Sequence, residues 1–284
     1  MRSNALAVVR GAGDLATAVG RRLHLCGFAV VHLEIPRPVA IRRAVAFASA
    51  IYDGCITVEG VEAERAKDGA AALETARADK VAVMVDPEAG WLDRTRPRVL
   101  VDATMVKGKR ALSRPTVLSM ADFVVGLGPG FTVGADVHAV VETQRGHDLG
   151  RVLTAGCAAA FTGKPGDVSG ATVERVLRAP RAGVFVSARS IGDEIQKGEP
   201  VASVDGEPVV SGINGVLRGL LFHGLEVSAG QKVGDVDPSG ERQRCFTISD
   251  KANAVAGGVL EAVFASLTAA ANREGREPVF TSRP

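Results

Sequence analysis

The chain has 284 residues, a length that favours two domains over one. Apolar residues make up 46% of it, which is enough for a packed core, so an intrinsically disordered protein is excluded. The 34 Lys and Arg residues nearly balance the 32 Asp and Glu residues, and aromatic residues are only 4% of the chain, so nucleic acid is not an expected partner.

Neither a membrane span nor a secretion signal is expected. No apolar run approaches the length of a span, and the apolar stretch at residues 5–9 is too short for a signal peptide. The four cysteines are widely spaced, with no Cys-x-x-Cys pair, a pattern typical of neither a zinc knuckle nor a disulfide framework. These features favour a cytoplasmic protein with no membrane partner.

The first part of the sequence alternates short apolar runs with helical stretches. Strands are expected over residues 5–9, 28–33, 57–61, 81–85, 99–101 and 123–127, and helices over residues 14–25 and 68–78. This alternation is typical of a parallel sheet covered on both faces. Residues 1–130 are therefore predicted to form a Rossmann-like nucleotide-binding domain of the α/β class.

A glycine pattern connects the first strand to the first helix: Gly11-x-Gly13-x-x-Ala16, with Gly20 one turn later. Gly11 allows the sharp turn, and Gly13 lets a phosphate approach the backbone amides at the helix N-terminus. Glu34 ends the second strand, where a ribose-binding acid is expected. Nucleotide binding is favoured over a glycine turn without a ligand.

Charged residues surround this loop. Asp14 suits the helix dipole but would repel a pyrophosphate, so capping the helix or holding a ligand hydroxyl or a cation remain open roles. Three arginines follow the second strand and are candidates for clamping phosphates: Arg37, Arg42 and Arg43. A solvated surface is the alternative interpretation of the arginines.

Residues 131–178 form a connecting segment, with strands expected at 137–142 and 151–153. Asp136, His138 and Glu142 fall on one face of the first of these strands, because their spacings are even. Such a trio suits a metal ion or proton transfer, but its spacing matches no established metal pattern, so no metal site is expected. A polar strand edge beside a ligand cleft is favoured.

The sequence from residue 183 repeats after 32 residues, so that Gly183, Gly192 and Gly198 align with Gly215, Gly224 and Gly230. Residues 179–240 are therefore predicted to form a small all-β module of the biotinyl/lipoyl type. The hairpin between the two halves, residues 205–208, has no lysine to modify, so a carrier function is not expected. A helix over residues 249–272 is expected in the C-terminal segment 241–284.

Several blocks of the sequence resemble one known family. These blocks are RGAGDLA at residues 10–16, EIPRPVAIRR at 34–43, YDG at 52–54, GLGPGF at 126–131, ETQRGH at 142–147, LGRV at 149–152 and ERVLRAP at 174–180. The chain resembles the YqeB-like proteins of the selenium-dependent molybdenum hydroxylase system, from about residue 5 to residue 265. The N-terminal half is also similar to the Rossmann part of XdhC-type maturation factors.

The resemblance implies an accessory protein that matures molybdenum hydroxylases, binds a nucleotide or molybdopterin dinucleotide, and acts in selenium or sulfur insertion. The implied partners are a molybdenum hydroxylase or its cofactor-assembly proteins, with self-association as an open alternative. An NAD(P)-dependent oxidoreductase and a non-enzymatic adaptor that docks onto a hydroxylase are the competing hypotheses. The catalytic candidates are Glu142 and His147 for proton transfer, and Cys157 for chalcogen transfer.

Overall fold

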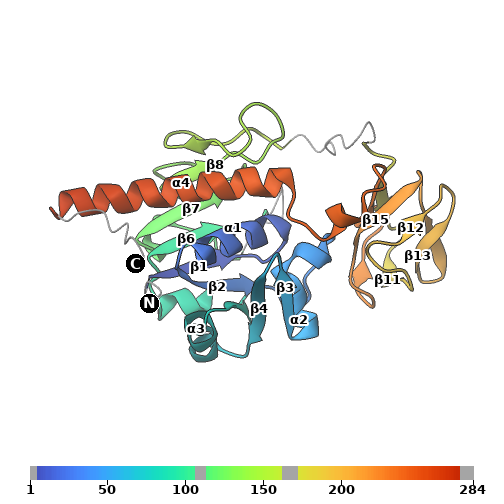
Figure 1. Ribbon diagram of the computed structural model, residues 1–284, viewed down its shortest axis with the longest axis horizontal. Coiled ribbons are helices and arrows are strands. Elements are labelled where there is room, and N and C mark those ends of the chain that lie inside the picture. Colours follow the sequence, from blue (N-terminus) through green and yellow to red (C-terminus); the bar gives the residue numbers. More distant parts are fainter. Residues whose placement is uncertain (1–4, 106–112, 162–171, 276–284) are drawn as a thin grey trace.

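The computed structural model describes residues 5–105, 113–161 and 172–275. Figure 1 shows a layered α/β body and, at one end of it, a smaller all-β unit. We call the smaller unit the β module and define it as the strands from Val176 to Asp237.

The body contains nine strands and four α-helices within the described residues. They are β1 (Leu6–Arg10), α1 (Asp14–Leu25), β2 (Ala29–Glu34), α2 (Ala50–Asp53), β3 (Cys55–Val58), β4 (Val61–Ala66), α3 (Gly69–Arg77), β5 (Val81–Val85), β6 (Val99–Asp102), β7 (Phe123–Leu127), β8 (Ala139–Val141), β9 (Val152–Leu153) and α4 (Asp250–Arg273). The expected N-terminal helices and the capped C-terminal helix are confirmed.

All nine body strands form one sheet in the described structure, in the order β3-β4-β5-β2-β1-β6-β7-β8-β9. The seven inner strands run parallel to one another, and the two edge strands, β3 and β9, are antiparallel to their neighbours. Strand order reverses at β1, because the chain builds outward through β2 first and through β6 later. In open α/β sheets, such a reversal leaves a crevice at the carboxyl ends of the strands.

Helices cover both faces of this sheet. One face packs against α1 and α4, which lie side by side in Figure 1, and the other packs against α3. By length and composition, α4 is long and apolar enough to cross a membrane, contrary to the expectation from the apolar runs. Its many small Ala residues explain this, and a core helix of a globular protein passes the same test; here one face of α4 contacts α1, β7, β8 and β9.

The segment at residues 57–61, expected as one strand, is the turn of a hairpin. Glu59 and Gly60 have φ values of 43° and 81°, and β3 pairs with β4 across them. A two-residue turn with positive φ at both positions matches the twist of paired strands. The expectation failed because Glu at the first turn position carries no turn signal.

The β module consists of two antiparallel sheets, each with four strands in the described residues. Their orders are β10-β17-β15-β12 and β14-β13-β11-β16. The strands are β10 (Val176–Arg178), β11 (Gly183–Val186), β12 (Glu194–Ile195), β13 (Pro200–Val204), β14 (Glu207–Val210), β15 (Gly215–Leu220), β16 (Glu226–Val227) and β17 (Lys232–Asp237). The 32-residue repeat relates β11, β12 and β13 to β15, β16 and β17, and all six aligned glycines have positive φ.

The expected combination of a Rossmann-like parallel sheet and a small biotinyl/lipoyl-like module is wrong. The large sheet is mixed, because the β3–β4 hairpin and the return of the chain through β9 add antiparallel edges. It continues through β8 and β9 to Leu153, and α4 returns from the far end of the chain to cover it. The remaining strands form two antiparallel sheets, in which β10 and β14 extend the repeat.

Candidate functional site

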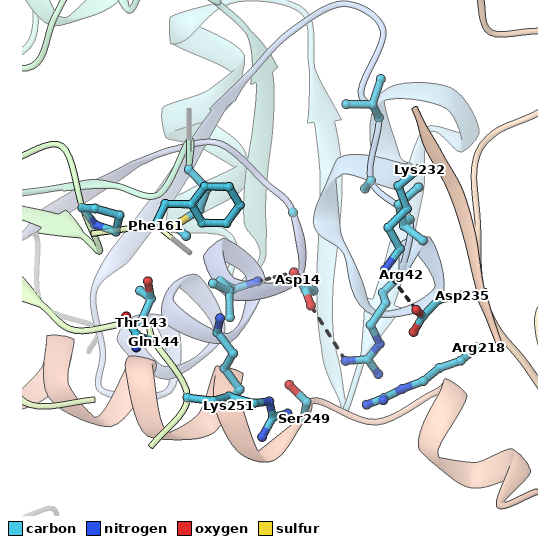
Figure 2. Close-up of a pocket in the computed structure, with 18 of the residues that line it drawn as sticks. Asp14, Arg42, Thr143, Gln144, Phe161, Arg218, Lys232, Asp235, Ser249 and Lys251 are labelled. Carbon is cyan, nitrogen blue, oxygen red and sulfur yellow. Dashed lines mark hydrogen bonds and ion pairs between the residues drawn. The ribbon is translucent and has the colours of Figure 1, made fainter. Parts of the chain in front are cut away.

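A cavity of about 690 Å³ lies at the carboxyl ends of the parallel strands, between the body and the β module (Figure 2). The loops that follow β1, β6, β7 and β8 form its body side, where they contribute Gly13, Met105, Pro129 and Thr143. The site therefore coincides with the crevice expected where the strand order reverses.

Positive charge dominates the cavity wall. Among the described residues that line it, six are cationic and two are carboxylates: Arg42, Arg145, Arg175, Arg218, Lys232 and Lys251 against Asp14 and Asp235. Because each charge is partly removed from water, the excess of cations raises the free energy of the empty cavity.

Arg42 lies where the body meets the β module, and its side chain is only 11% exposed. Its Nη2 donates to the carbonyl oxygens of Arg244 and Thr247, at 3.0 and 2.8 Å. Its Nε and Nη1 are buried without a hydrogen bond to the described residues, and Nη1 lies 3.9 Å from Asp14 Oδ2. Burial and the neighbouring Arg218 lower the pKa of Arg42 below its ordinary value.

Arg218 reaches the cavity from β15, and its side chain is 12% exposed. Its Nη1 lies 3.4 Å from Asp237 Oδ2, and its buried Nε makes no hydrogen bond to the described part of the chain. Figure 2 shows the guanidinium groups of Arg42 and Arg218 directed toward one another. Two like charges held together in a poorly solvated place favour an anion between them.

Two further cations, Arg175 just before β10 and Lys232 of β17, share one buried carboxylate. Asp235 Oδ1 accepts from Arg175 Nη1 at 2.5 Å and from Lys232 Nζ at 3.0 Å. One carboxylate therefore holds two cations at this wall of the cavity.

Lys251 reaches the cavity from the first turn of α4. It makes no hydrogen bond or ion pair with the residues that the structure describes. Burial is the main cause that lowers its pKa below the lysine value of 10.5. Its neighbour Asp250 is instead held by Arg145 through two hydrogen bonds of 2.7 and 3.0 Å, which lower the pKa of Asp250 to about 2.

One backbone amide of the glycine loop is bound by a side chain of the protein itself, that of Glu34. Glu34 Oε2 accepts from Ala12 N and Oε1 accepts from Ile35 N, both at 2.7 Å. Gly13 caps α1 without a side-chain hydrogen bond and faces open space, while Asp14 accepts from Leu15 N at 3.0 Å. The carboxylate of Glu34 therefore stabilises the loop conformation, and burial raises its pKa.

Glu142 has a similar role on the other side of the cavity. Its side chain is buried, Oε1 accepts from Thr143 N and Gln144 N, and Oε2 accepts from Ala159 N. All three of these partners belong to cavity-lining residues. Because its carboxylate accepts from three backbone amides, Glu142 holds the cavity wall in place.

The other predicted site residues lie away from the cavity. Ala16 is buried in the core, and Arg37, His147 and Cys157 are exposed without lining the cavity. Arg43 Nε donates to Leu220 O at 3.0 Å, which joins the body to the β module. Of the predicted residues, the structure brings Gly13, Asp14 and Arg42 together at the cavity.

The polar residues of the expected strand edge, Asp136 and His138, each form a hydrogen bond of their own with a backbone amide. Asp136 Oδ2 accepts from Thr132 N at 2.8 Å, and His138 Nδ1 accepts from Val124 N at 3.0 Å. Neither contacts Glu142, and within residues 5–105, 113–161 and 172–275 no group of three or more His, Cys, Asp or Glu side chains could hold a metal ion.

The cavity cations of the C-terminal half were not among the predicted site residues. Arg218, Lys232 and Lys251 come from two strands and a helix that are remote from the glycine loop in the sequence. No motif links them, and only the packing of the β module and α4 against the body brings them to the cavity.

Comparison with known proteins identifies one curated relative, whose description is uncharacterized protein YqeB, from Escherichia coli strain K12. The two are 46% identical over 261 residues, which is 91% of this chain and 47% of the relative. The chain thus spans about half the length of the relative. The resemblance to YqeB-like proteins is confirmed by this identity, which by itself says nothing of a molybdenum hydroxylase system. No family model matches the chain.

Solved structures give only weak likenesses. An aspartoacylase family protein from Mesorhizobium loti is 11% identical, with a TM-score of 0.25 over 83% of this chain and 85% of the other. A succinylglutamate desuccinylase from a Silicibacter species is 14% identical, with a TM-score of 0.23 over 83% and 85% of the two chains. These TM-scores are too low to show a shared fold.

The expected role in maturing molybdenum hydroxylases is contradicted. The curated relative is described only as uncharacterized and gives this role no support. The expected handling of selenium and the expected binding of molybdenum cofactor or a nucleotide depended on that role and lose their support as well. The oxidoreductase alternative depended on Glu34 holding a ribose, yet Oε2 of Glu34 accepts from Ala12 N and Oε1 accepts from Ile35 N. The hypothesis of a non-enzymatic adaptor that docks onto a hydroxylase depended on the same assignment and loses its basis as well.

Proposed function

We propose that this protein binds a small anionic molecule, through phosphate or carboxylate groups, in the cavity between the body and the β module. Arg42 and Arg218 would hold the anion from the side of the β module, and Lys251 from the side of α4. Gly13 and Asp14 would border it at the start of α1. A small molecule, rather than nucleic acid or a membrane, is the partner that a concave site of this size suits.

The observation that carries this proposal is the incomplete pairing of the cavity cations. Arg42 and Arg218 are almost fully buried, lie close enough for one to lower the pKa of the other, and keep buried N–H groups without hydrogen bonds to the described residues. Lys251 has no carboxylate within ion-pair distance in the described residues. Buried charges are normally paired, so an anionic ligand supplies the missing partner.

Thermal unfolding with inorganic phosphate, pyrophosphate and succinate, each against sodium chloride at equal ionic strength, tests the proposal. A ligand present at a hundred times its Kd stabilises a protein by about 2.7 kcal/mol. Lys251→Gln is expected to reduce this stabilisation. Lys80→Gln is the matched control, because Lys80 forms surface ion pairs with Glu62 and Glu64 outside the cavity. If none of the three anions stabilises the protein, the proposal is wrong.

A cytoplasmic location is a second inference, and the cysteines support it. All four are free thiols, and Cys26, Cys55 and Cys157 are exposed. Exposed thiols persist in reducing compartments and are paired in oxidising ones. Fractionation of cells that express the tagged chain should recover it with cytoplasmic markers, and recovery in the membrane or secreted fraction would contradict the inference.

A further inference from the structure

Asp14 is the first residue of α1 and lines the cavity among its cations. Figure 2 shows its carboxylate near the centre of the site, joined to Arg42 by a dashed line. Its side chain is 39% exposed, so the carboxylate is open to a molecule that enters the cavity. The sequence leaves three roles open for this residue: capping the helix, holding a cation or holding a hydroxyl group of the ligand.

The hydrogen bonds at the start of α1 do not give Asp14 the capping role. Gly13 is the N-cap residue, and in the described residues Asp14 makes one hydrogen bond, in which its Oδ1 accepts from Leu15 N at 3.0 Å. A capping side chain instead accepts from an amide two or three residues further along the chain. Asp68 shows that arrangement at α3, where it accepts from Ala71 N at 2.9 Å.

The surroundings of Asp14 do not suit a cation either. The described residues contain no group of three or more His, Cys, Asp or Glu side chains that could hold a metal ion. Arg42 Nη1 lies 3.9 Å from Asp14 Oδ2, and Lys251 is near enough for the Asp14 carboxylate to oppose the effect of burial on its pKa. Because these two cations repel any further cation, the ligand group that meets Asp14 is a neutral hydrogen-bond donor.

Oδ2 of Asp14 is the oxygen left for such a donor. It accepts no hydrogen bond from the described residues, and its 3.9 Å contact with Arg42 Nη1 is too long to be one. By contrast, Asp235, the other carboxylate among the described lining residues, accepts from both Arg175 and Lys232. An anion bound to Arg42 is therefore repelled by Asp14, unless it carries a donor that reaches this oxygen.

Neutral polar side chains line the same cavity, namely Thr143, Gln144 and Ser249 (Figure 2). Ser249 Oγ accepts from Ala252 N, and its O–H donates to no described residue. Hydroxyl and amide groups donate and accept hydrogen bonds without charge, so they match hydroxyl groups of a ligand. The volume of about 690 Å³ has room for such a ligand, because pockets of about 300–1,000 Å³ hold small organic molecules.

We propose that the ligand is a hydroxylated anion, whose anionic group binds Arg42 and Arg218 and whose hydroxyl group donates to Asp14. This inference rests on the proposed function and adds a second point of recognition. The arginines would bind many anions alike, and Asp14 would select those that carry a hydroxyl group near the charge.

Calorimetric titration with propyl phosphate and glycerol 3-phosphate tests the inference. The two probes have the same anionic group and the same number of carbon atoms, and they differ in their hydroxyl groups. Glycerol 3-phosphate is expected to bind about tenfold more tightly, since a hydrogen bond to a charged group contributes at least that factor. Propionate and glycerate repeat the comparison with a carboxylate, and the pair that binds identifies the anionic group.

Asp14→Ala should abolish the difference within the pair, because it removes both the acceptor for the hydroxyl group and the repulsion of the plain anion. Asp68→Ala is the matched control, since Asp68 lies at the start of another helix and does not line the cavity, and it should preserve the difference. Equal affinity within the pair in the natural chain would overturn the inference and leave the proposed function intact. So would a difference that persists in Asp14→Ala. Absence of binding by all four probes would instead overturn the proposed function, and the inference with it.

Discussion

Lys251 is a cavity residue whose charge should depend on pH in an accessible range. Burial lowers its pKa below 10.5, and Asp14 opposes this effect only in part. The ammonium form is the one that attracts an anion, so its contribution is present at low pH and disappears as the pH rises through the lowered pKa. For an unperturbed lysine the same loss would occur only near pH 10.5.

We therefore expect anion affinity to fall with rising pH at values below the normal range of lysine titration. Sulfate is a suitable probe, because its charge is constant over this range, and its Kd can be followed by calorimetry. Lys251→Arg should retain affinity at high pH, since a guanidinium keeps its charge. The same decline in Lys251→Arg as in the natural chain would show that another group is responsible.

At the scale of elements, α4 connects the site to the core. Ser249 caps it by accepting from Ala252 N, and Lys251 in the first turn lines the cavity. Further along the helix, Gly258 lies directly against the loop before β9, where a Cβ would be only 2.2 Å from Gly150 O. This close approach sets how near α4 lies to the sheet.

Gly258→Ala is expected to destabilise the protein by about 1–3 kcal/mol, because the added methyl group meets backbone atoms that must shift. The gain in helix propensity, about 1 kcal/mol, offsets part of this cost. Urea unfolding measures the difference. Gly257→Ala is the control on the same helix, because its Cβ would meet only the end of the Arg22 side chain, at 3.4 Å. Equal stability of the two variants would contradict the packing argument.

At the scale of the whole molecule, the site depends on how the β module docks. Tyr52 of the body stacks on Phe222 of the β module with ring centroids 3.9 Å apart, and Leu220 N donates to Ile41 O at 2.8 Å. Ile41 and Tyr52 pack against the core of the β module rather than that of the body. Docking thus brings Arg218 and Lys232 to a cavity whose other walls belong to the body.

Phe222→Ala is therefore expected to weaken anion binding even though Phe222 does not line the cavity. Loss of a stacked aromatic pair costs about 0.5–1.5 kcal/mol beyond the lost burial, and looser docking separates the cations. Calorimetry measures the affinity, and limited proteolysis between the two units measures docking. Val210→Ala, at an exposed position of β14, is the control. Unchanged affinity alongside increased cleavage would show that the site does not require the β module.

Much of the secondary structure could be predicted because its signals are local. Alternating apolar runs and helical stretches located most of the inner strands, and the glycine spacing revealed the 32-residue repeat. The packing role of an individual glycine was harder to predict. Gly20 follows the glycine loop by one turn, yet its Cβ would lie 2.0 Å from Nε2 of the fully buried His32, so close packing requires it. That neighbour comes from β2, and the sequence does not show which residues face each other.

The sequence by itself determined most of the helices and inner strands, since backbone preferences and apolar periodicity act over a few residues. Only the tertiary structure decided that Glu34 binds the Ala12 amide of the glycine loop, because that depends on the direction of a single N–H group. It also decided that cations from β15, β17 and α4 share a cavity with Arg42. Electrostatic interactions act through space, so charges far apart in the chain make a binding site only after packing has brought them together.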